Sequence, residues 1–166
     1  FLDGELQPTV ELDHESGLKC STLRASPSDG RQLATGDFAG GVCIWDMETL
    51  SANSRPIWSV NKAHAGLVNC IDGVGGVERG YGAPELATGG RDGVVRIWDP
   101  RQHDPVAAIA PIKSTAARDC WTVAFGGASD EVERCVAAGY DNGDVKLLDL
   151  RTNKIRWETN VKVSAV

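Results

Sequence analysis

The chain has 166 residues, 42% of them hydrophobic, and a formal net charge of −6. This length is enough for one ordinary domain, and an acidic chain without a basic stripe argues against nucleic acid or an anionic membrane as the main partner. No apolar run approaches the ~20 residues of a membrane-spanning helix. The acidic residues near the start exclude a signal peptide there; they are Asp3, Glu5, Glu11, Asp13 and Glu15.

Strand-like segments recur along the whole chain, and no amphipathic helix is predicted between them. Residues 5–13 predict an outer strand, in which Pro8 suits a sheet edge because it cannot donate to a ladder. Three groups of four strands follow. The first group covers 18–23, 33–36, 42–45 and 55–60; the second covers 67–72, 86–88, 94–98 and 105–109; the third covers 119–125, 131–139, 144–148 and 154–158.

The middle strand pair of each group belongs to a fourteen-residue repeat that aligns without a gap. The copies read LATGDFAGGVCIWD at 33–46, LATGGRDGVVRIWD at 86–99 and VAAGYDNGDVKLLD at 136–149. Their last residues are separated by 53 and then 50 positions, slightly more than the ~40–45 residues of a four-stranded propeller blade. Within the second copy, Asp92-Gly93 predicts a type I′ hairpin turn.

These three hairpins, ending in Trp-Asp or Leu-Asp, resemble those of the WD-repeat β-propeller family. The resemblance implies an all-β fold of four-stranded blades. Because a closed propeller usually has 4–8 blades, we expect residues 1–166 to form a single partial propeller within a longer one. The expected parts are the outer strand of a preceding blade over 1–14, blades over 15–61, 62–110 and 111–159, and the start of a next blade over 160–166.

A histidine, a hydroxyl and a carboxylate in the second blade could suggest a nucleophilic triad. The resemblance implies a structural role instead, in which His64, Thr88, Asp92 and Trp98 form a buried hydrogen-bond relay, because a buried indole N–H needs an acceptor. The other blades depart from this pattern. The first has Ala39 at the aspartate position and no histidine at the expected place; the third has Ala138, Asn142 and Leu148 at the hydroxyl, turn and tryptophan positions.

Other signatures of enzymes are weak. The glycine-rich stretch 73–84 lacks the Gly-Lys-Ser/Thr ending of a phosphate loop and is expected to be an elongated surface loop. Cys120 could be a nucleophile beside Arg118, but a buried core cysteine is the simpler interpretation. The five cysteines show no CxxC spacing, and none of the three histidines pairs with one at ligand spacing. We therefore predict no catalysis, no metal and no cofactor, and reduced thiols in a cytoplasmic protein.

Two narrower resemblances suggest different functions. Residues 82–102, 118–126, 138–151 and 156–160 are similar to WD-repeat proteins linked to cytoplasmic preassembly of axonemal dynein. That likeness implies a chaperone adaptor whose partners are AAA ATPases, prefoldin-like subunits and dynein chains. The alternative rests on Trp98-Asp99-Pro100-Arg101, which resembles the WDxR ending of substrate receptors of cullin-type ubiquitin ligases. Arg101 could equally be a surface arginine paired with Asp99.

Loops that precede inner strands and loops inside the repeated hairpins share one face of a propeller. This geometry places a candidate partner-contact patch on that face, although ordinary solvated charge is an equal explanation for each residue singly. The patch comprises Lys62, Arg91, Lys113, Arg118 and Asp119, with Trp121 nearby.

Overall fold

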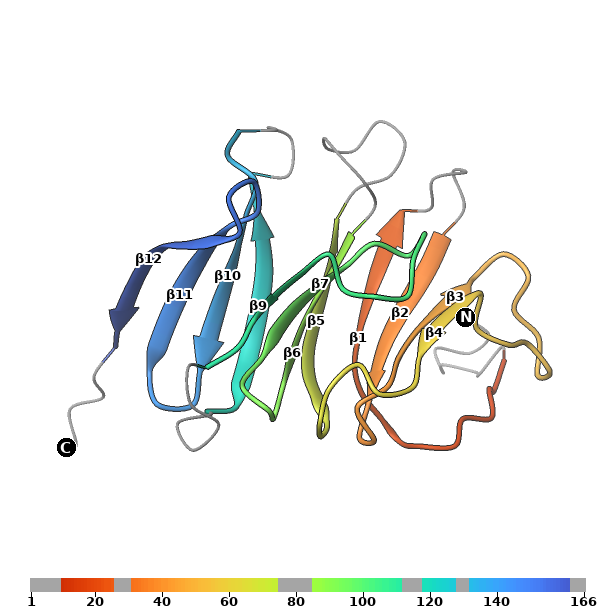
Figure 1. Cartoon of the computed structure of the whole chain (residues 1–166). Helices are drawn as coiled ribbons and strands as arrows, with labels where there is room; N and C mark the ends of the chain where they lie inside the picture. Colours follow the sequence, from red (N-terminus) through yellow and green to blue (C-terminus); the bar gives the residue numbers. More distant parts are fainter. Residues whose placement is uncertain (1–9, 26–30, 75–84, 112–117, 128–131, 162–166) are drawn as a thin grey trace, which may run out of the picture.

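The computed structural model describes residues 10–25, 31–74, 85–111, 118–127 and 132–161. Within these ranges the chain forms twelve β-strands and no helix. The strands make three antiparallel sheets of four strands each (Figure 1). The all-β fold with four-stranded blades is therefore confirmed. The same ranges contain no helix that is long and apolar enough to cross a membrane.

Each sheet is a meander in which consecutive strands pair, and we refer to the sheets as blades 1, 2 and 3. Blade 1 contains β1 (Leu18–Ala25), β2 (Arg31–Asp37), β3 (Val42–Asp46) and β4 (Trp58–Val60). Blade 2 contains β5 (Val68–Val74), β6 (Glu85–Gly90), β7 (Val95–Trp98) and β8 (Ala107–Ile109). Blade 3 contains β9 (Cys120–Gly126), β10 (Cys135–Tyr140), β11 (Asp144–Asp149) and β12 (Lys154–Asn160).

The hairpin turns of the three repeats differ from the expected type I′ geometry. Only the glycine of each turn has a positive φ, at 90° for Gly40, 73° for Gly93 and 85° for Gly143, whereas Asp92 does not. In blade 2 the Gly93 N–H donates to the Gly90 carbonyl at 3.1 Å, and the Gly90 N–H donates to the Val94 carbonyl at 3.2 Å. This is the longer hairpin loop that ends on a left-handed glycine, and it leaves the residue before the glycine in an ordinary conformation.

Apolar side chains fill the space between neighbouring sheets, because the central strands of each blade are apolar on both faces. Ile44 and Trp58 of blade 1 pack with Val68 and Trp98 of blade 2 in one cluster. A second cluster lies between blades 2 and 3 and includes Ile97. Figure 1 shows the first strands of the blades, β1, β5 and β9, side by side. The core is therefore two apolar layers between three sheets.

Polar contacts also join blades 2 and 3. The Asp72 carboxylate accepts a 2.8 Å hydrogen bond from the Phe125 N–H. Arg134 pairs with Glu85, and both side chains are mostly buried. Burial raises the pKa of Glu85, although the Arg134 guanidinium opposes that rise. The two blades are thus held in register by directional contacts as well as by apolar packing.

Only part of each end segment lies in the described ranges, and the assignment of these segments to neighbouring blades stays a prediction. Residues 10–14, the described part of the outer strand expected over 1–14, lie in no strand, and residues 1–9 lie outside the described ranges. The segment instead runs against blade 1, where the Phe38 N–H donates to the Gly17 carbonyl at 3.0 Å. At the other end, residue 160 still belongs to β12, and most of the start of a next blade expected over 160–166 lies outside the described residues.

Candidate functional site

The polar group in blade 2 is a continuous chain of short contacts. The Trp98 indole N–H donates to the Thr88 hydroxyl at 2.8 Å. His64 Nε2 lies 2.8 Å from the same hydroxyl, and His64 Nδ1 lies 2.9 Å from Asp92 Oδ1. The side chains come from the segment before β5, from β6, from the β6–β7 turn and from β7. The structure thus brings together all four residues that the sequence singled out, from four successive parts of the blade.

The partners of His64 assign its proton. A carboxylate only accepts, so the 2.9 Å contact with Asp92 requires a hydrogen on Nδ1. Nε2 is then free to accept from the Thr88 hydroxyl, whose oxygen already accepts from Trp98. An Arg96 nitrogen lies 3.0 Å from Nδ1 and 3.1 Å from Asp92 Oδ2; since Arg96 can only donate, the carboxylate oxygen is its acceptor. Every donor in the chain therefore has one acceptor.

Burial decides what this group can do. Thr88 is 0% exposed, and Trp98 and His64 are 2% and 3% exposed. Although burial alone raises the pKa of Asp92, the His64 hydrogen bond and the N–H groups of Ala65 and Val94 hold it well below its ordinary value. A hydroxyl with no exposed surface cannot attack a substrate. The arrangement is therefore a structural hydrogen-bond network inside the blade.

Gly90 leaves the space that the imidazole occupies. A Cβ at this position would lie 2.3 Å from His64 Nδ1 and 2.8 Å from Asp92 Oδ1. The equivalent residues of the other repeats carry side chains, Asp37 in blade 1 and Tyr140 in blade 3. The buried histidine of blade 2 therefore depends on a glycine at position 90.

Blade 1 contains a histidine that the sequence analysis did not assign. His14 lies three residues before Gly17, just as His64 lies three residues before Leu67; the carbonyls of Gly17 and Leu67 both accept from the hairpin turn of their blade. The expectation that blade 1 lacks a histidine at this place is therefore wrong. It failed because residues 10–14 were interpreted as part of a preceding blade.

The blade 1 group is looser than that of blade 2. The Trp45 N–H donates to Thr35 at 3.1 Å, but His14 Nε2 lies 3.9 Å from the nearest Asp37 oxygen. Asp37 binds the backbone of the turn instead: its Oδ1 accepts hydrogen bonds from the N–H groups of Ala39 and Gly41, both at 2.8 Å. An aspartate two residues earlier thus compensates for the alanine in the turn.

Blade 3 replaces the relay with a network at its surface. Asn142 and Asn160 donate to the two carboxylate oxygens of Asp144 at 2.8 and 2.7 Å. These hydrogen bonds, first from Asn160 and then from Asn142, lower the pKa of Asp144. With Ala138 and Leu148 in its interior, the blade has no buried indole N–H at this position to satisfy.

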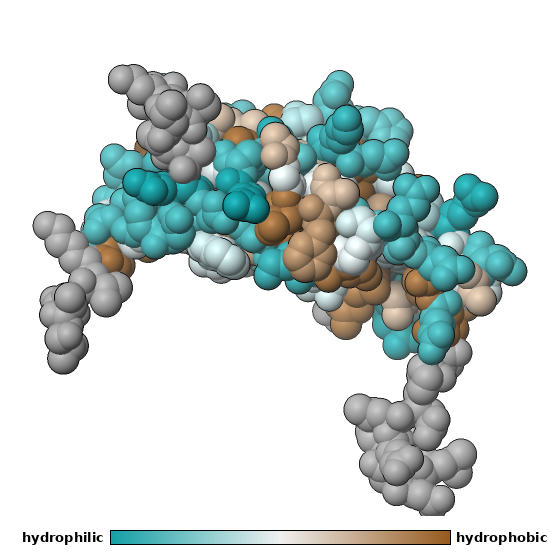
Figure 2. Space-filling view, turned by 90° about the horizontal axis from the view of Figure 1, so that it is seen from below, coloured by the Kyte–Doolittle hydropathy of each residue, from teal (hydrophilic) through white to brown (hydrophobic). Residues whose placement is uncertain are grey.

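The residues of the predicted contact patch that the structure describes lie on the face of the hairpin turns. Lys62, Arg91 and Arg118 are exposed, Asp119 is half-buried and Trp121 is 51% exposed. Figure 2, seen from the side of these turns, shows apolar surface near the middle of the face with hydrophilic surface on both sides. Lys113 lies outside the described residues. Within the described ranges no side-chain hydrogen bond, ion pair or cation–π contact joins these residues to one another, so they share a face rather than a single site.

Lys19 is a further residue of this face that sequence reasoning did not select. Its ammonium lies 5.6 Å from the centre of the Trp121 ring. Lys19, Asn69 and Trp121 occupy equivalent irregular positions of β1, β5 and β9, where the register with the next strand shifts. A cation over an indole is a favourable contact, and it joins blade 1 to blade 3 across the intervening strand.

Arg101 lies at the opposite end of the strands from the hairpin turns, since it follows β7. Its side chain is 70% exposed, and its guanidinium donates to both carboxylate oxygens of Asp99, with Nε contacts of 2.9 and 3.0 Å. In the WDxR ending, the Arg101 side chain is thus exposed and at the same time paired with Asp99.

The five cysteines are free thiols. Burial raises the pKa of Cys20 and of Cys43 to about 11 in each case. Cys120, the possible nucleophile, is 0% exposed and therefore out of reach of a substrate. Among the described residues no three histidine, cysteine or acidic side chains gather in a way that could hold a metal ion.

A comparison with protein families gives a match in the region of blade 2. Residues 48–99 match the family described as WD domain, G-beta repeat. The matched range ends at Asp99, the last residue of the repeat whose polar group is complete.

Curated relatives cover nearly the whole chain. It is 54% identical over 159 residues to Dynein axonemal assembly factor 10 of Chlamydomonas reinhardtii. The alignment covers 95% of this chain and 43% of that protein. The protein of the same name from Homo sapiens is 51% identical over 160 residues, covering 96% of this chain and 44% of that protein. The chain therefore spans less than half the length of the curated relatives it matches.

Solved structures agree on the fold. The WD40 domain of Toxoplasma gondii coronin superimposes with a TM-score of 0.68 at 16% identity, over 90% of this chain and 35% of that chain. The structure of U3-55K gives 0.66 at 16% identity, over 90% and 41%. At such low identity the likeness concerns the propeller architecture alone.

Proposed function

Since the chain belongs to the WD-repeat β-propeller family, we propose that it is a non-enzymatic protein-interaction scaffold that acts in the assembly of axonemal dynein. The observation that carries the proposal is the 54% identity over 159 residues to Dynein axonemal assembly factor 10 of Chlamydomonas reinhardtii. That identity extends over all three blades rather than over one repeat.

The geometry supports a scaffold more than a catalyst. In the histidine–hydroxyl–carboxylate group of blade 2, His64 and Thr88 are buried, Asp92 is half-buried, and each member is engaged by another member. A rigid blade presents its loops with little loss of conformational freedom on binding. The exposed charges of the hairpin-turn face, together with Trp121, are the surface we assign to partners.

In finer detail, we propose a cytoplasmic chaperone adaptor. Its partners would be AAA ATPases, prefoldin-like subunits and the dynein chains themselves. Five free thiols suit a reducing compartment.

The test is rescue of ciliated cells that lack their own assembly factor, using the full-length protein that contains this chain. We expect rescue to restore dynein arms on axonemes and dynein heavy chains in the cytoplasm. A Lys62→Glu, Arg91→Glu double variant should rescue poorly. An Arg55→Glu, Arg151→Glu double variant is the matched control, because it makes the same change of charge at exposed positions away from that face. Full-length wild-type protein that restores no dynein arms would contradict the proposal.

The alternative function, a substrate receptor of a cullin-type ubiquitin ligase, rests on the exposed Arg101 side chain. Affinity capture of the wild-type protein and of Arg101→Glu separates the two. Recovery of a cullin and its propeller adaptor by the wild type, and its loss in the variant, would favour the receptor. Recovery of AAA ATPases and dynein chains by both proteins would favour the assembly adaptor.

A further inference from the structure

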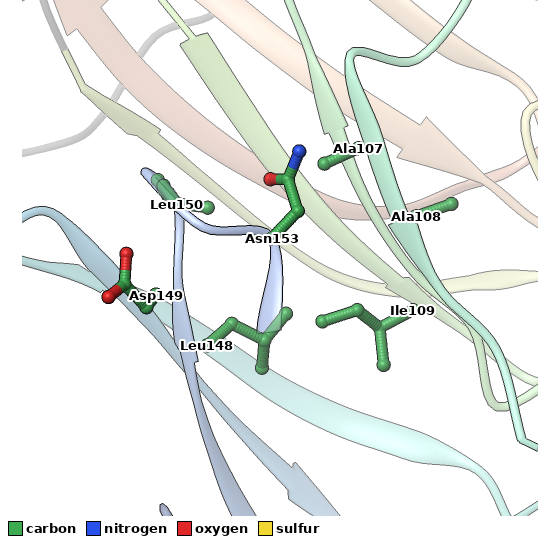
Figure 3. Close-up of a pocket in the computed structure, with 7 residues that line it drawn as sticks. All are labelled: Ala107, Ala108, Ile109, Leu148, Asp149, Leu150 and Asn153. Atoms are coloured by element: carbon green, nitrogen blue, oxygen red, sulfur yellow. The ribbon is translucent and has the colours of Figure 1, made fainter. Parts of the chain in front are cut away.

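A groove opens on the outer rim between blades 2 and 3. It has a volume of about 170 Å³ and is lined by Ala107 and Ile109 of β8, by Leu148 of β11 and by Asn153 of the β11–β12 turn. Figure 3 shows Leu148 and Ile109 facing each other across it, with Asn153 next to Ala107 and Asp149 at its edge. The space far exceeds the ~10–15 Å³ that one water molecule needs.

The neighbouring interface shows why this groove exists. Strand register makes Trp58 the counterpart of Ala107, since Ile44 pairs with Trp58 and the equivalent Ile97 pairs with Ala107. The repeat makes Trp98 the counterpart of Leu148. Two tryptophans that fill the rim between blades 1 and 2 are thus replaced by an alanine and a leucine between blades 2 and 3.

The filled interface also shows how an indole is held at this position. Trp58 and Trp98 meet edge to face with their ring centres 6.0 Å apart. The Trp58 N–H donates to the Gln102 carbonyl at 2.9 Å, and its ring stacks on His103 with an interplanar angle of 7°. In the open groove, the turn of the next blade contributes Asn153 beside Ala107 in the same way.

A negative charge, the carboxylate of Asp149, lies at the edge of the groove. Asp99 is clamped by the guanidinium of Arg101, but its counterpart Asp149 is bound through Oδ1 by the backbone N–H groups of Arg151 and Thr152, at 2.9 and 3.1 Å. Hydrogen bonding by the Thr152 and Arg151 backbone lowers the pKa of Asp149. At the rim of blade 3, the Asp149 carboxylate therefore lacks the bidentate arginine contact that Asp99 has in blade 2.

We propose that this groove is a docking site for a partner protein segment that inserts a tryptophan side chain next to a basic residue. The indole would take the place that Trp58 takes in the adjacent interface, packed on Leu148 and Ile109. The basic residue would pair with Asp149. This proposal is independent of the dynein role, because it concerns the chemistry of the groove and not the identity of the partner.

The test uses fluorescence anisotropy of dye-labelled peptides with the full-length protein. The probe is an acetylated Lys-Trp-Lys peptide, compared with Lys-Ala-Lys and Glu-Trp-Glu peptides. We expect the Trp-to-Ala and the Lys-to-Glu changes each to weaken binding by about tenfold or more. An Ala107→Trp variant, which places the missing indole in the groove, should weaken binding of Lys-Trp-Lys to the same degree. Val106→Trp, at the exposed residue just before β8, is the matched control and should bind like the wild type.

Leu148→Trp fills the groove from the other blade and serves if Ala107→Trp does not fold, as judged by thermal unfolding. Equal binding of Lys-Trp-Lys to the wild type and to a folded groove-filling variant would overturn the proposal. Equal binding of Lys-Ala-Lys to the wild type would overturn it as well. Sedimentation of the unliganded protein identifies the other occupant: a dimer that Ala107→Trp dissociates would mean that a second copy fills the groove.

Discussion

The two interfaces between neighbouring blades solve the same packing problem differently. Between blades 1 and 2, Trp58 and Trp98 fill the outer rim, and the Trp98 N–H is satisfied by Thr88. Between blades 2 and 3, the equivalent residues are Ala107 and Leu148, and a groove of about 170 Å³ remains. One interface is closed by aromatic side chains from within the chain, and the other is open.

The difference shows that the complete polar relay occurs in the blade whose tryptophan closes the rim. A buried indole needs an acceptor, the acceptor hydroxyl needs its own partner, and the imidazole that provides it needs a carboxylate and an adjacent glycine. Blade 3, where Leu148 replaces the tryptophan, also has Ala138 in place of the hydroxyl and Asn142 in place of the carboxylate. Blade 3 thus lacks the indole, its hydroxyl acceptor and the carboxylate together.

The largest expected effect is therefore at Trp98. Trp98→Ala removes a side chain that is 2% exposed, and we expect a loss of ~3–5 kcal/mol in the free energy of unfolding. Denaturant unfolding of the full-length protein measures it. Trp157→Ala, at a position that is 52% exposed on β12, is the matched control and should cost less than ~0.5 kcal/mol. Equal losses at the two tryptophans would mean that burial of Trp98 in the closed interface adds no stability.

The relay residues come next. His64→Ala or Asp92→Ala leaves buried polar partners unsatisfied, and we expect each to cost ~1–3 kcal/mol. Asn142→Ala changes the equivalent turn of blade 3, where the side chain is exposed, and should stay within ~0.5 kcal/mol of the wild type. Thermal melts of the three variants in the full-length protein test this ranking. An unchanged melting temperature for both relay variants would mean that the hydrogen bonds of blade 2 add nothing to its stability.

Acidification should weaken blade 2 through Asp92. Its pKa is lower in the folded chain than in the unfolded chain, so the stability it contributes is present above the ordinary carboxyl pKa of ~3.9 and is lost as the pH falls below that value. Asp92→Asn cannot lose this contribution. Urea unfolding at a series of pH values should therefore show the gap between wild type and Asp92→Asn narrowing below pH ~4. A gap that stays constant to the lowest pH at which the protein folds would contradict this role.

Much of this fold is readable from the sequence because its signals are local. Short apolar strands, turn glycines and the gapless repeat predict the three hairpins, and the repeat positions together with the family resemblance select the four relay residues of blade 2. The turn type was wrong because φ at Asp92 depends on the loop length that the hydrogen bonds of Gly90 and Gly93 set.

Other features depend on contacts between distant residues and leave no local pattern. His14 was missed because its place is fixed by the hydrogen bond from the Phe38 N–H to the Gly17 carbonyl, which no spacing within residues 10–17 reveals. The rim groove results from the absence of two large side chains on different blades. Ala107 and Leu148 are ordinary apolar residues in sequence, and only their pairing across the interface shows what is missing.

The smallest expected effect is at His14, and it compares the two histidines directly. His14 occupies the position equivalent to His64, but its Nε2 lies 3.9 Å from Asp37, and its side chain is 20% exposed. A pair at that separation and exposure contributes ~0–1 kcal/mol, so His14→Ala should destabilise less than His64→Ala in the same unfolding assay. Asp37→Ala should cost more than His14→Ala, because it also removes the acceptor for the Ala39 and Gly41 N–H groups. If His14→Ala instead equals His64→Ala, then the carboxylate distance does not set the strength of the relay, and the packing of His14 against the edge of Trp45 carries the contribution.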